Sequence, residues 1–152
     1  MRRLPAMILV GLFALVAATS GRLTADNTKK ADVKSQDKLV GTWKMVKAMY
    51  GGKEVPIPEG TTQIKHITQT HFMFVDYNKN GKFIDAFGGP YTLNGEKYEE
   101  TPEYGTGDAF SNIRGKSQLF ECRVDGDKWF HKGKLSNGLT IDEVWERVKK
   151  EK

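Results

Sequence analysis

Four Asn-Gly or Asp-Gly dipeptides divide most of this 152-residue chain into short segments; they are Asn80-Gly81, Asn94-Gly95, Asp125-Gly126 and Asn137-Gly138. These dipeptides adopt positive φ angles at low cost and favour two-residue or bulged hairpin turns. The segments between them are short and rich in β-branched and aromatic residues, which favour strands. The expected strands are Val40 to Tyr50, Ile64 to Tyr77, Lys82 to Ala86, Gly89 to Leu93, Lys97 to Thr101, Ser117 to Asp125, Lys128 to Leu135 and Thr140 to Val148. The pattern predicts an all-β fold, an antiparallel meander of about eight strands.

A meander of this length either closes into an up-and-down β-barrel or remains two stacked sheets. Closure is favoured because it removes exposed strand edges and brings the last strand beside the first. Two long segments interrupt the strand pattern, residues 51–62 and residues 101–115, and we expect them to form the loops at the mouth of the barrel. The sequence therefore predicts an antiparallel up-and-down barrel over residues 39–152.

The N-terminal segment has the pattern of an export signal. Arg2 and Arg3 precede an apolar run from Leu4 to Ala18, and small residues suited to cleavage follow. We expect a signal peptide over residues 1–25, a mature start at Gly21 or Asp26, and a flexible polar linker over residues 26–38. The chain would then be periplasmic or secreted, with no stable membrane insertion. The alternative is an uncleaved signal anchor, for which the apolar run is short because a bilayer span needs about 20 residues.

The charge pattern argues against nucleic acid as a partner, and the single cysteine excludes an intramolecular disulfide. The net charge is +5, but cleavage before Asp26 removes three of the 24 basic residues and none of the 19 acidic ones, which leaves +2. The remaining basic residues alternate with acidic ones and form no phosphate-binding stripe, so nucleic acid is not an expected partner. Cys122 is the only cysteine and cannot form an intramolecular disulfide. Its alternation with Glu121 and Arg123 predicts a buried core position.

The alternation of residues along a strand predicts which side chains point into the barrel and could form an internal site. If Trp43 and Arg147 both face inward, period two places Lys47 on the inner face of the first strand and Glu143 on that of the last. Further polar residues occur at alternating positions in the strands between. The candidate cavity residues are Lys47, His71, Tyr98, Glu100, His131 and Glu143.

These candidates suit a polar cavity lining better than a metal or catalytic centre. Two histidines and a carboxylate from different strands could ligate a metal or act as acid and base, yet the chain has no H-x-H or H-E-x-x-H pair. It also lacks G-x-S-x-G, P-loop and G-x-G-x-x-G motifs. We therefore assign no catalytic residue, metal or cofactor.

The opening Gly41-Thr42-Trp43 and the late Arg147, together with segments such as Gly88 to Leu93 and Asp142 to Arg147, resemble the lipocalin-like (calycin) domains of uncharacterised secreted bacterial proteins. The resemblance spans residues 39–148. It implies that Trp43 plugs one end of a barrel and that the Arg147 guanidinium stacks over its indole, so that Gly41, Trp43 and Arg147 form a structural clasp. It further implies small-molecule binding in preference to an enzyme. The chain departs from secreted animal lipocalins because it has no disulfide and no T-D-Y motif.

The leading hypothesis is an exported lipocalin-like barrel that binds a small amphipathic or hydrophobic molecule in a polar-lined cavity. One alternative is a small barrel enzyme, an isomerase or hydrolase that uses His71 or His131 as a base with Glu100 or Glu143. Another is a protein-interaction or inhibitor module that acts through the loops at residues 51–62 and 101–115, with a filled interior.

Overall fold

The computed structural model describes residues 37–149, and the expected signal peptide at residues 1–25 and almost all of the linker lie outside this range. Within it, ten β-strands and the short helix α2 follow a helical turn at residues 37–39. None of the helices among these residues has the length and apolar character needed to cross a membrane. The bounds are β1 Gly41–Tyr50, β2 Lys53–Val55, β3 Thr61–Ile67, β4 His71–Asn78, β5 Phe83–Asn94, β6 Lys97–Glu100, β7 Tyr104–Thr106, α2 Asp108–Ile113, β8 Gln118–Asp125, β9 Lys128–Lys134 and β10 Thr140–Arg147.

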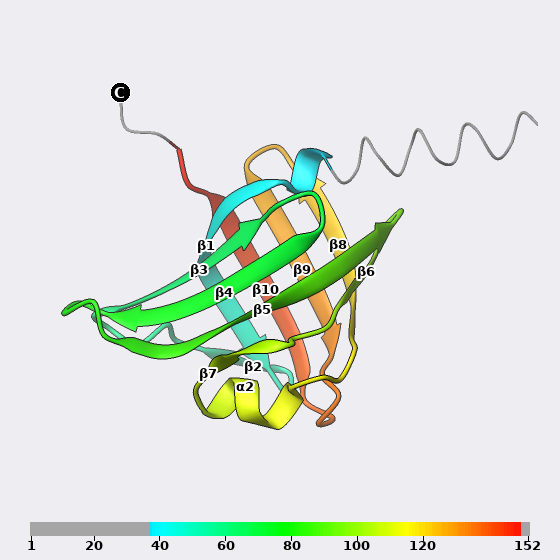
Figure 1. Ribbon diagram of the computed structural model, residues 1–152. Helices are drawn as coiled ribbons and strands as arrows, with labels where there is room; N and C mark the ends of the chain where they lie inside the picture. The colour runs from blue at the N-terminus through cyan, green and yellow to red at the C-terminus, as the bar shows by residue number, and fades with distance from the viewer. Residues whose placement is uncertain (1–36, 150–152) are drawn as a thin grey trace, which may run out of the picture.

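Eight of these strands form a closed antiparallel barrel (Figure 1). Their order around the barrel is β1, β3, β4, β5, β6, β8, β9 and β10, and β10 pairs back onto β1. Strand β2 pairs with β1 beyond this ring, and β7 pairs with β5. Neighbours around the barrel are neighbours along the chain, which confirms the predicted all-β, up-and-down barrel of about eight strands.

The segment from Ile64 to Tyr77 contains parts of two strands, so the single strand expected there is wrong. A turn at Thr68 separates β3 from β4, and no glycine, proline or asparagine marks it. The Thr68 side chain makes the turn, because its Oγ1 accepts hydrogen bonds from the backbone N–H groups of Thr70 and His71 at 3.3 and 3.0 Å. Threonine hydroxyls stabilise turns in this way.

Strand β5 runs without a break where two strands were expected. Gly88 and Gly89 have no positive φ and lie within the strand. Their role is close packing: a Cβ at Gly88 would lie 2.6 Å from the Phe72 carbonyl oxygen, and one at Gly89 would overlap the Thr101 carbonyl oxygen. Glycine thus marks a close backbone approach here and not a turn.

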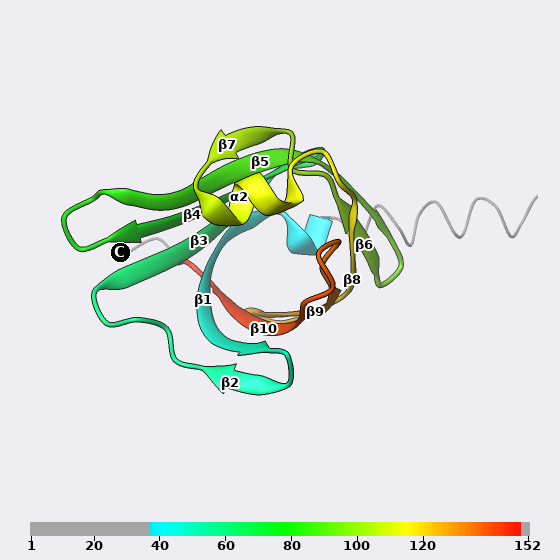
Figure 2. The same ribbon diagram turned by 90° about the horizontal axis from the view of Figure 1, so that it is seen from below.

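The segment of residues 101–115, expected to be a mouth loop, contains β7 and α2. Seen from below, α2 lies at one end of the barrel, on the side of the rim formed by β5 and β7 (Figure 2). Two side chains anchor it inward, because Phe110 and Ile113 are both buried. The Asp85 carboxylate holds the start of the helix by accepting a hydrogen bond from the Ala109 N–H at 3.0 Å. The helix therefore borders the interior at one end of the barrel.

Aromatic side chains dominate the core. Trp43, Trp129 and Trp145 are fully buried, and the Trp129 ring contacts each of the other two at a centroid distance of 5.8 Å. Cys122 is also buried, as its alternation predicted, and burial raises the pKa of its thiol to about 12. A thiol with such a pKa is a core side chain and a poor nucleophile at neutral pH.

The contact expected between Trp43 and Arg147 is present at the end of the barrel opposite α2. The Arg147 guanidinium carbon lies 4.1 Å from the Trp43 ring centroid, and Trp43 and Arg147 are paired in register between β1 and β10. Nη1 of Arg147 donates to the Val40 carbonyl at 2.9 Å, and Nε1 of Trp43 donates to the Leu39 carbonyl at 2.8 Å. These bonds tie the chain that leads into β1 to the last strand.

Gly41 is required at this end of the barrel because its φ is 146° and a Cβ there would overlap Nη1 of Arg147. We expect Gly41→Ala to cost about 1 to 3 kcal/mol in backbone strain, plus the displacement of Arg147. Gly51→Ala is the control, because Gly51 has a φ of 59° but nothing within 4 Å of the added methyl group. Urea denaturation of both variants should show the larger loss of stability for Gly41→Ala, and equal losses would contradict the steric role of Gly41.

Candidate functional site

An interior cavity of about 230 Å³ lies between the barrel wall and α2. Its wall is mostly apolar and aromatic, with a small set of ionisable side chains. Exposed residues of α2 and of the β9–β10 turn also border it, which places its mouth at Asn112, Asn137 and Leu139. The deeper lining comprises Tyr50, Lys65, Phe74, Phe87, Glu100, Ile113, Phe120, His131, Ile141, Glu143 and Trp145.

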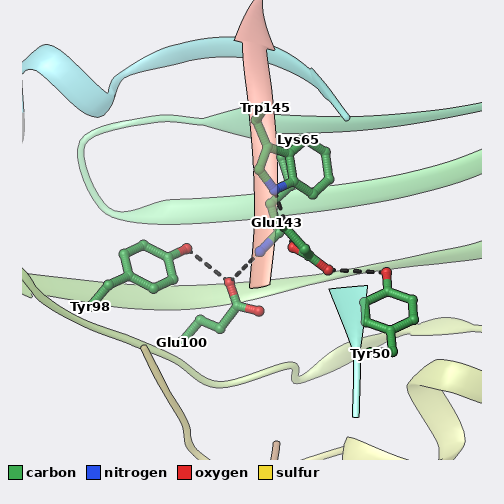
Figure 3. Close-up of polar contacts among 6 residues, drawn as sticks. All are labelled: Tyr50, Lys65, Tyr98, Glu100, Glu143 and Trp145. Carbon is green, nitrogen blue, oxygen red and sulfur yellow. Dashed lines mark hydrogen bonds and ion pairs between the residues drawn. The ribbon is translucent and has the colours of Figure 1, made fainter. Parts of the chain in front are cut away.

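A buried ion pair forms one side of this cavity (Figure 3). Nζ of Lys65 lies 2.9 Å from Oε2 of Glu100, and the Tyr98 hydroxyl donates to the same oxygen at 2.9 Å. The Lys65 ammonium also lies 5.4 Å from the ring centroids of Phe72 and Trp129. Burial, and then the Glu100 charge, raise the pKa of Tyr98 well above its usual value, so Tyr98 remains a donor. Lys65 and Glu100 thus compensate each other's charge in a setting where an unpaired ion is costly.

Glu143 is the second carboxylate of the cavity, and its hydrogen-bond partners are neutral. The Tyr50 hydroxyl donates to Oε1 and the Trp145 indole N–H donates to Oε2, both at 3.1 Å (Figure 3). Burial raises the pKa of Glu143, although Lys65 and the two donors act in the opposite direction. Burial and the adjacent Glu143 charge likewise raise the pKa of Tyr50. Glu143 is therefore a carboxyl group that takes up a proton more readily than an exposed one.

His131 is fully buried in the cavity wall, and neither ring nitrogen has a hydrogen-bond partner among residues 37–149. Burial, followed by the nearby Lys65 charge, lowers the pKa of His131 well below its usual value, so the ring is neutral at physiological pH. A neutral imidazole has one donor and one acceptor. Leaving both unpaired costs about 1 to 3 kcal/mol each, which is unusual for a buried polar group.

The structure brings together four of the six cavity candidates: Tyr98, Glu100, His131 and Glu143 are all buried inside the barrel. Lys47 is not among them. Its side chain is 47% exposed and lies 3.3 Å from Glu54 on the outer surface. The cause is a β-bulge, because the register of β1 against β10 shifts between Met45 and Lys47. The simple alternation from Trp43 onward therefore gives the wrong face for Lys47.

His71 also lies outside the cavity, which corrects the other expected position. It is exposed at the start of β4, where its Nδ1 lies 2.8 Å from the Thr70 hydroxyl. It therefore does not converge with His131. His131 in turn forms no hydrogen bond with Glu100 or Glu143. The histidine–carboxylate pair on which the enzyme alternative depends is absent from the part of the chain that the structure describes.

Two important cavity residues, Lys65 and Tyr50, were not singled out from the sequence. Lys65 lies two residues before Ile67, which is buried, so alternation would have placed Lys65 on the inner face of β3 if the end of the strand at Ile67 had been predicted. β3 and β4 were instead expected to form one strand, and the inward position of Lys65 was therefore not recognised. Tyr50 faces inward only because the bulge shifts the alternation, and no local residue type signals that bulge.

A broader depression of about 1,010 Å³ lies elsewhere, over β6, β8, β9 and β10. Much of its lining is exposed and charged, including Lys97, Glu121, Lys132 and Lys134, and Leu119 there is 62% exposed. Its lining also includes the buried residues Tyr98, Phe120 and Ile141, of which Phe120 and Ile141 border the interior cavity as well.

No family model matches the sequence, and no match was found among the curated proteins. Among solved structures, the chain is similar to a de novo designed fluorescence-activating β-barrel, with 15% identity, a TM-score of 0.48, and coverage of 75% of this chain and 97% of the designed one. It is also similar to a point mutant of the fluorescent protein UnaG, with 13% identity, a TM-score of 0.38, and coverage of 75% and 99%. Neither similarity identifies a ligand for this chain.

Proposed function

We propose that this chain is an exported lipocalin-like barrel that binds a small amphipathic molecule in the interior cavity. The observation that carries the proposal is His131, which lines the cavity and whose two buried nitrogens have no hydrogen-bond partner among residues 37–149. A ligand with a polar group would satisfy these nitrogens and remove the cost of leaving them unpaired.

The size and lining of the cavity define the ligand further. A volume of about 230 Å³ equals roughly eight water molecules at ~30 Å³ each and lies below the ~300 to 1,000 Å³ typical of drug-sized sites. The apolar wall includes Phe74, Phe87 and Ile113, whereas His131 and Glu143 provide the polar contacts. A compact ligand with one apolar end and one polar end suits this arrangement.

Export is the part of the proposal that rests on the sequence, namely the charged start and apolar run of residues 1–25. It is tested by the mass of the protein purified from its own host, which should correspond to a chain that begins at Gly21 or Asp26. A mass that includes Met1 would contradict cleavage and favour the signal anchor.

Native mass spectrometry of protein purified from its own host tests binding. The wild type should carry a non-covalent adduct, and His131→Phe should lose it, because the larger ring fills part of the cavity and offers no hydrogen bond. His71→Ala is the matched control, since His71 is exposed on the outer surface and its removal should leave the adduct unchanged.

Binding should also change the fluorescence of Trp145, which lines the cavity. Release of the adduct by mild denaturation and refolding should alter the emission of the wild type and not that of His131→Phe. An empty wild-type protein across repeated preparations, or an adduct that survives in His131→Phe, would reject the proposed function at this site.

A further inference from the structure

The cavity contains more carboxylates than cations. Its ionisable lining residues are Lys65, Glu100, His131, Glu143 and Tyr50. Lys65 is paired with Glu100, whereas no lysine, arginine or histidine nitrogen of residues 37–149 lies within 4.0 Å of the Glu143 carboxylate. Glu143 is thus a buried acid without an ion-pair partner within that distance, although the Lys65 charge acts to lower its pKa.

An uncompensated buried carboxylate has two ways to lower its free energy: it takes up a proton, or it acquires a cation. The protein itself brings no second cation to Glu143, and burial raises the pKa of Glu143 although the Lys65 charge acts in the opposite direction. A positively charged group entering the cavity would provide the missing charge and displace the proton.

The surroundings of Glu143 suit such a group. Phe74 and Trp145 meet edge to face at 6.3 Å, Phe74 and Phe87 lie 4.8 Å apart, and all three rings line the cavity. Aromatic faces attract cations, and an ammonium beside both a carboxylate and aromatic rings is stabilised by each.

His131 completes the arrangement, because it is the direct cross-strand partner of Glu143 between β9 and β10. Such partners have Cβ atoms about 4.5 to 5.5 Å apart on the same face of a sheet. The imidazole is neutral, so it accepts a hydrogen bond from a cation without repelling it. A single ammonium group is small enough to contact both side chains.

We infer that the ligand is a small organic amine, bound as its ammonium ion between Glu143 and His131 with its apolar body against the aromatic wall. This inference rests on the proposed function and specifies the class of ligand. A carboxylate ligand is disfavoured because it would add a third negative group beside Glu100 and Glu143.

Three probes that share a phenyl ring but differ in charge test the inference: 2-phenylethylamine, 2-phenylethanol and 3-phenylpropionate. Titration of the purified chain, followed by Trp fluorescence and calorimetry, should show the amine binding at least about tenfold more tightly than the alcohol. The carboxylate should show no measurable binding. Binding of the alcohol or the carboxylate as tight as that of the amine would overturn the amine assignment while leaving a small-molecule site.

Glu143→Gln should abolish the preference, so that amine and alcohol bind equally. Asp142→Asn is the matched control, because it removes the same charge one residue away on β10 at a partly exposed position outside the cavity. It should retain the preference. An amine preference that persists in Glu143→Gln would overturn the role of Glu143.

The wild type provides a further test that needs no variant. As pH falls through the raised pKa of Glu143, the amine must displace a proton, so its affinity should fall by up to tenfold per pH unit while that of the alcohol stays constant. The amine itself remains protonated below about pH 9. Among the groups that face Glu143, His131 stays neutral and Tyr50 stays protonated over this range because of their shifted pKa values. The other two, Lys65 and Glu100, form an ion pair with each other in the structure.

A flat pH profile for the amine would overturn the inference. If none of the probes binds but native mass spectrometry still finds an adduct in the wild type, the amine class is wrong and the proposed function stands. If neither probe nor adduct is found, both fail.

Discussion

Lys65→Met is expected to lower the free energy of unfolding by about 3 to 5 kcal/mol, because it leaves the Glu100 carboxylate buried without its cation. Glu100 is only 4% exposed, and Tyr98 would be its remaining donor. The methionine keeps the length and apolar stem of lysine, so the loss reports on charge and not on packing. Urea denaturation at neutral pH measures it.

The double variant Lys65→Met/Glu100→Leu should recover most of this loss, since an apolar pair often replaces a buried ion pair at little cost. The coupling energy between the two positions should therefore be large. A single variant within about 1 kcal/mol of the wild type would show that water reaches Glu100 and that the pair is not truly buried.

Trp43→Ala should cost about 3 to 5 kcal/mol, a large part of the stability of a domain of this size. The indole is fully buried, contacts Trp129, bonds the Leu39 carbonyl and supports the Arg147 guanidinium. Truncation thus leaves a cavity and removes one half of the contact that ties the first strand to the last. Chemical denaturation with far-UV circular dichroism measures the change.

Phe83→Ala is the appropriate control, because Phe83 is a large aromatic residue that is 59% exposed. Its truncation should change stability by less than about 0.5 kcal/mol. If the two variants unfold at similar denaturant concentrations, the end of the barrel at Trp43 does not contribute as its burial indicates.

The strands flanked by Asn-Gly and Asp-Gly were predictable because these dipeptides by themselves favour a hairpin turn, whatever the rest of the fold. The hairpins at Asn94-Gly95 and Asp125-Gly126 are both present, with β6 and β9 following directly. The turn at Thr68 was not predicted because a threonine hydroxyl stabilises it, and the residue that usually indicates a turn, glycine, is absent there. Gly88 and Gly89 led to the wrong prediction of a break between two strands, whereas they allow close packing against Phe72 and Thr101 within one strand.

The interior was predictable where alternation holds and not where it breaks. Tyr98 with Glu100, and Glu143 with Trp145, face inward as strand periodicity requires. The prediction that Lys47 faces inward was wrong because the bulge in β1 depends on how two strands far apart in the sequence pair with each other. Which of the inward groups become partners is likewise decided by tertiary packing, which is why the Lys65–Glu100 pair emerged only from the structure.

Because of the bulge between Met45 and Lys47, the number of residues in β1 determines which side chains of that strand face the interior. The bulge allows one strand to turn both Trp43, at the closed end, and Tyr50, beside Glu143, toward the interior. Val46 is the bulge residue that has no cross-strand partner, so deleting it would restore simple alternation and keep Tyr50 facing inward. Deleting one residue between Lys47 and Tyr50 would instead turn Tyr50 toward the solvent while nearly the entire composition is preserved. Insertions and deletions in β1 are therefore a more direct route to a different interior than most substitutions in the cavity itself.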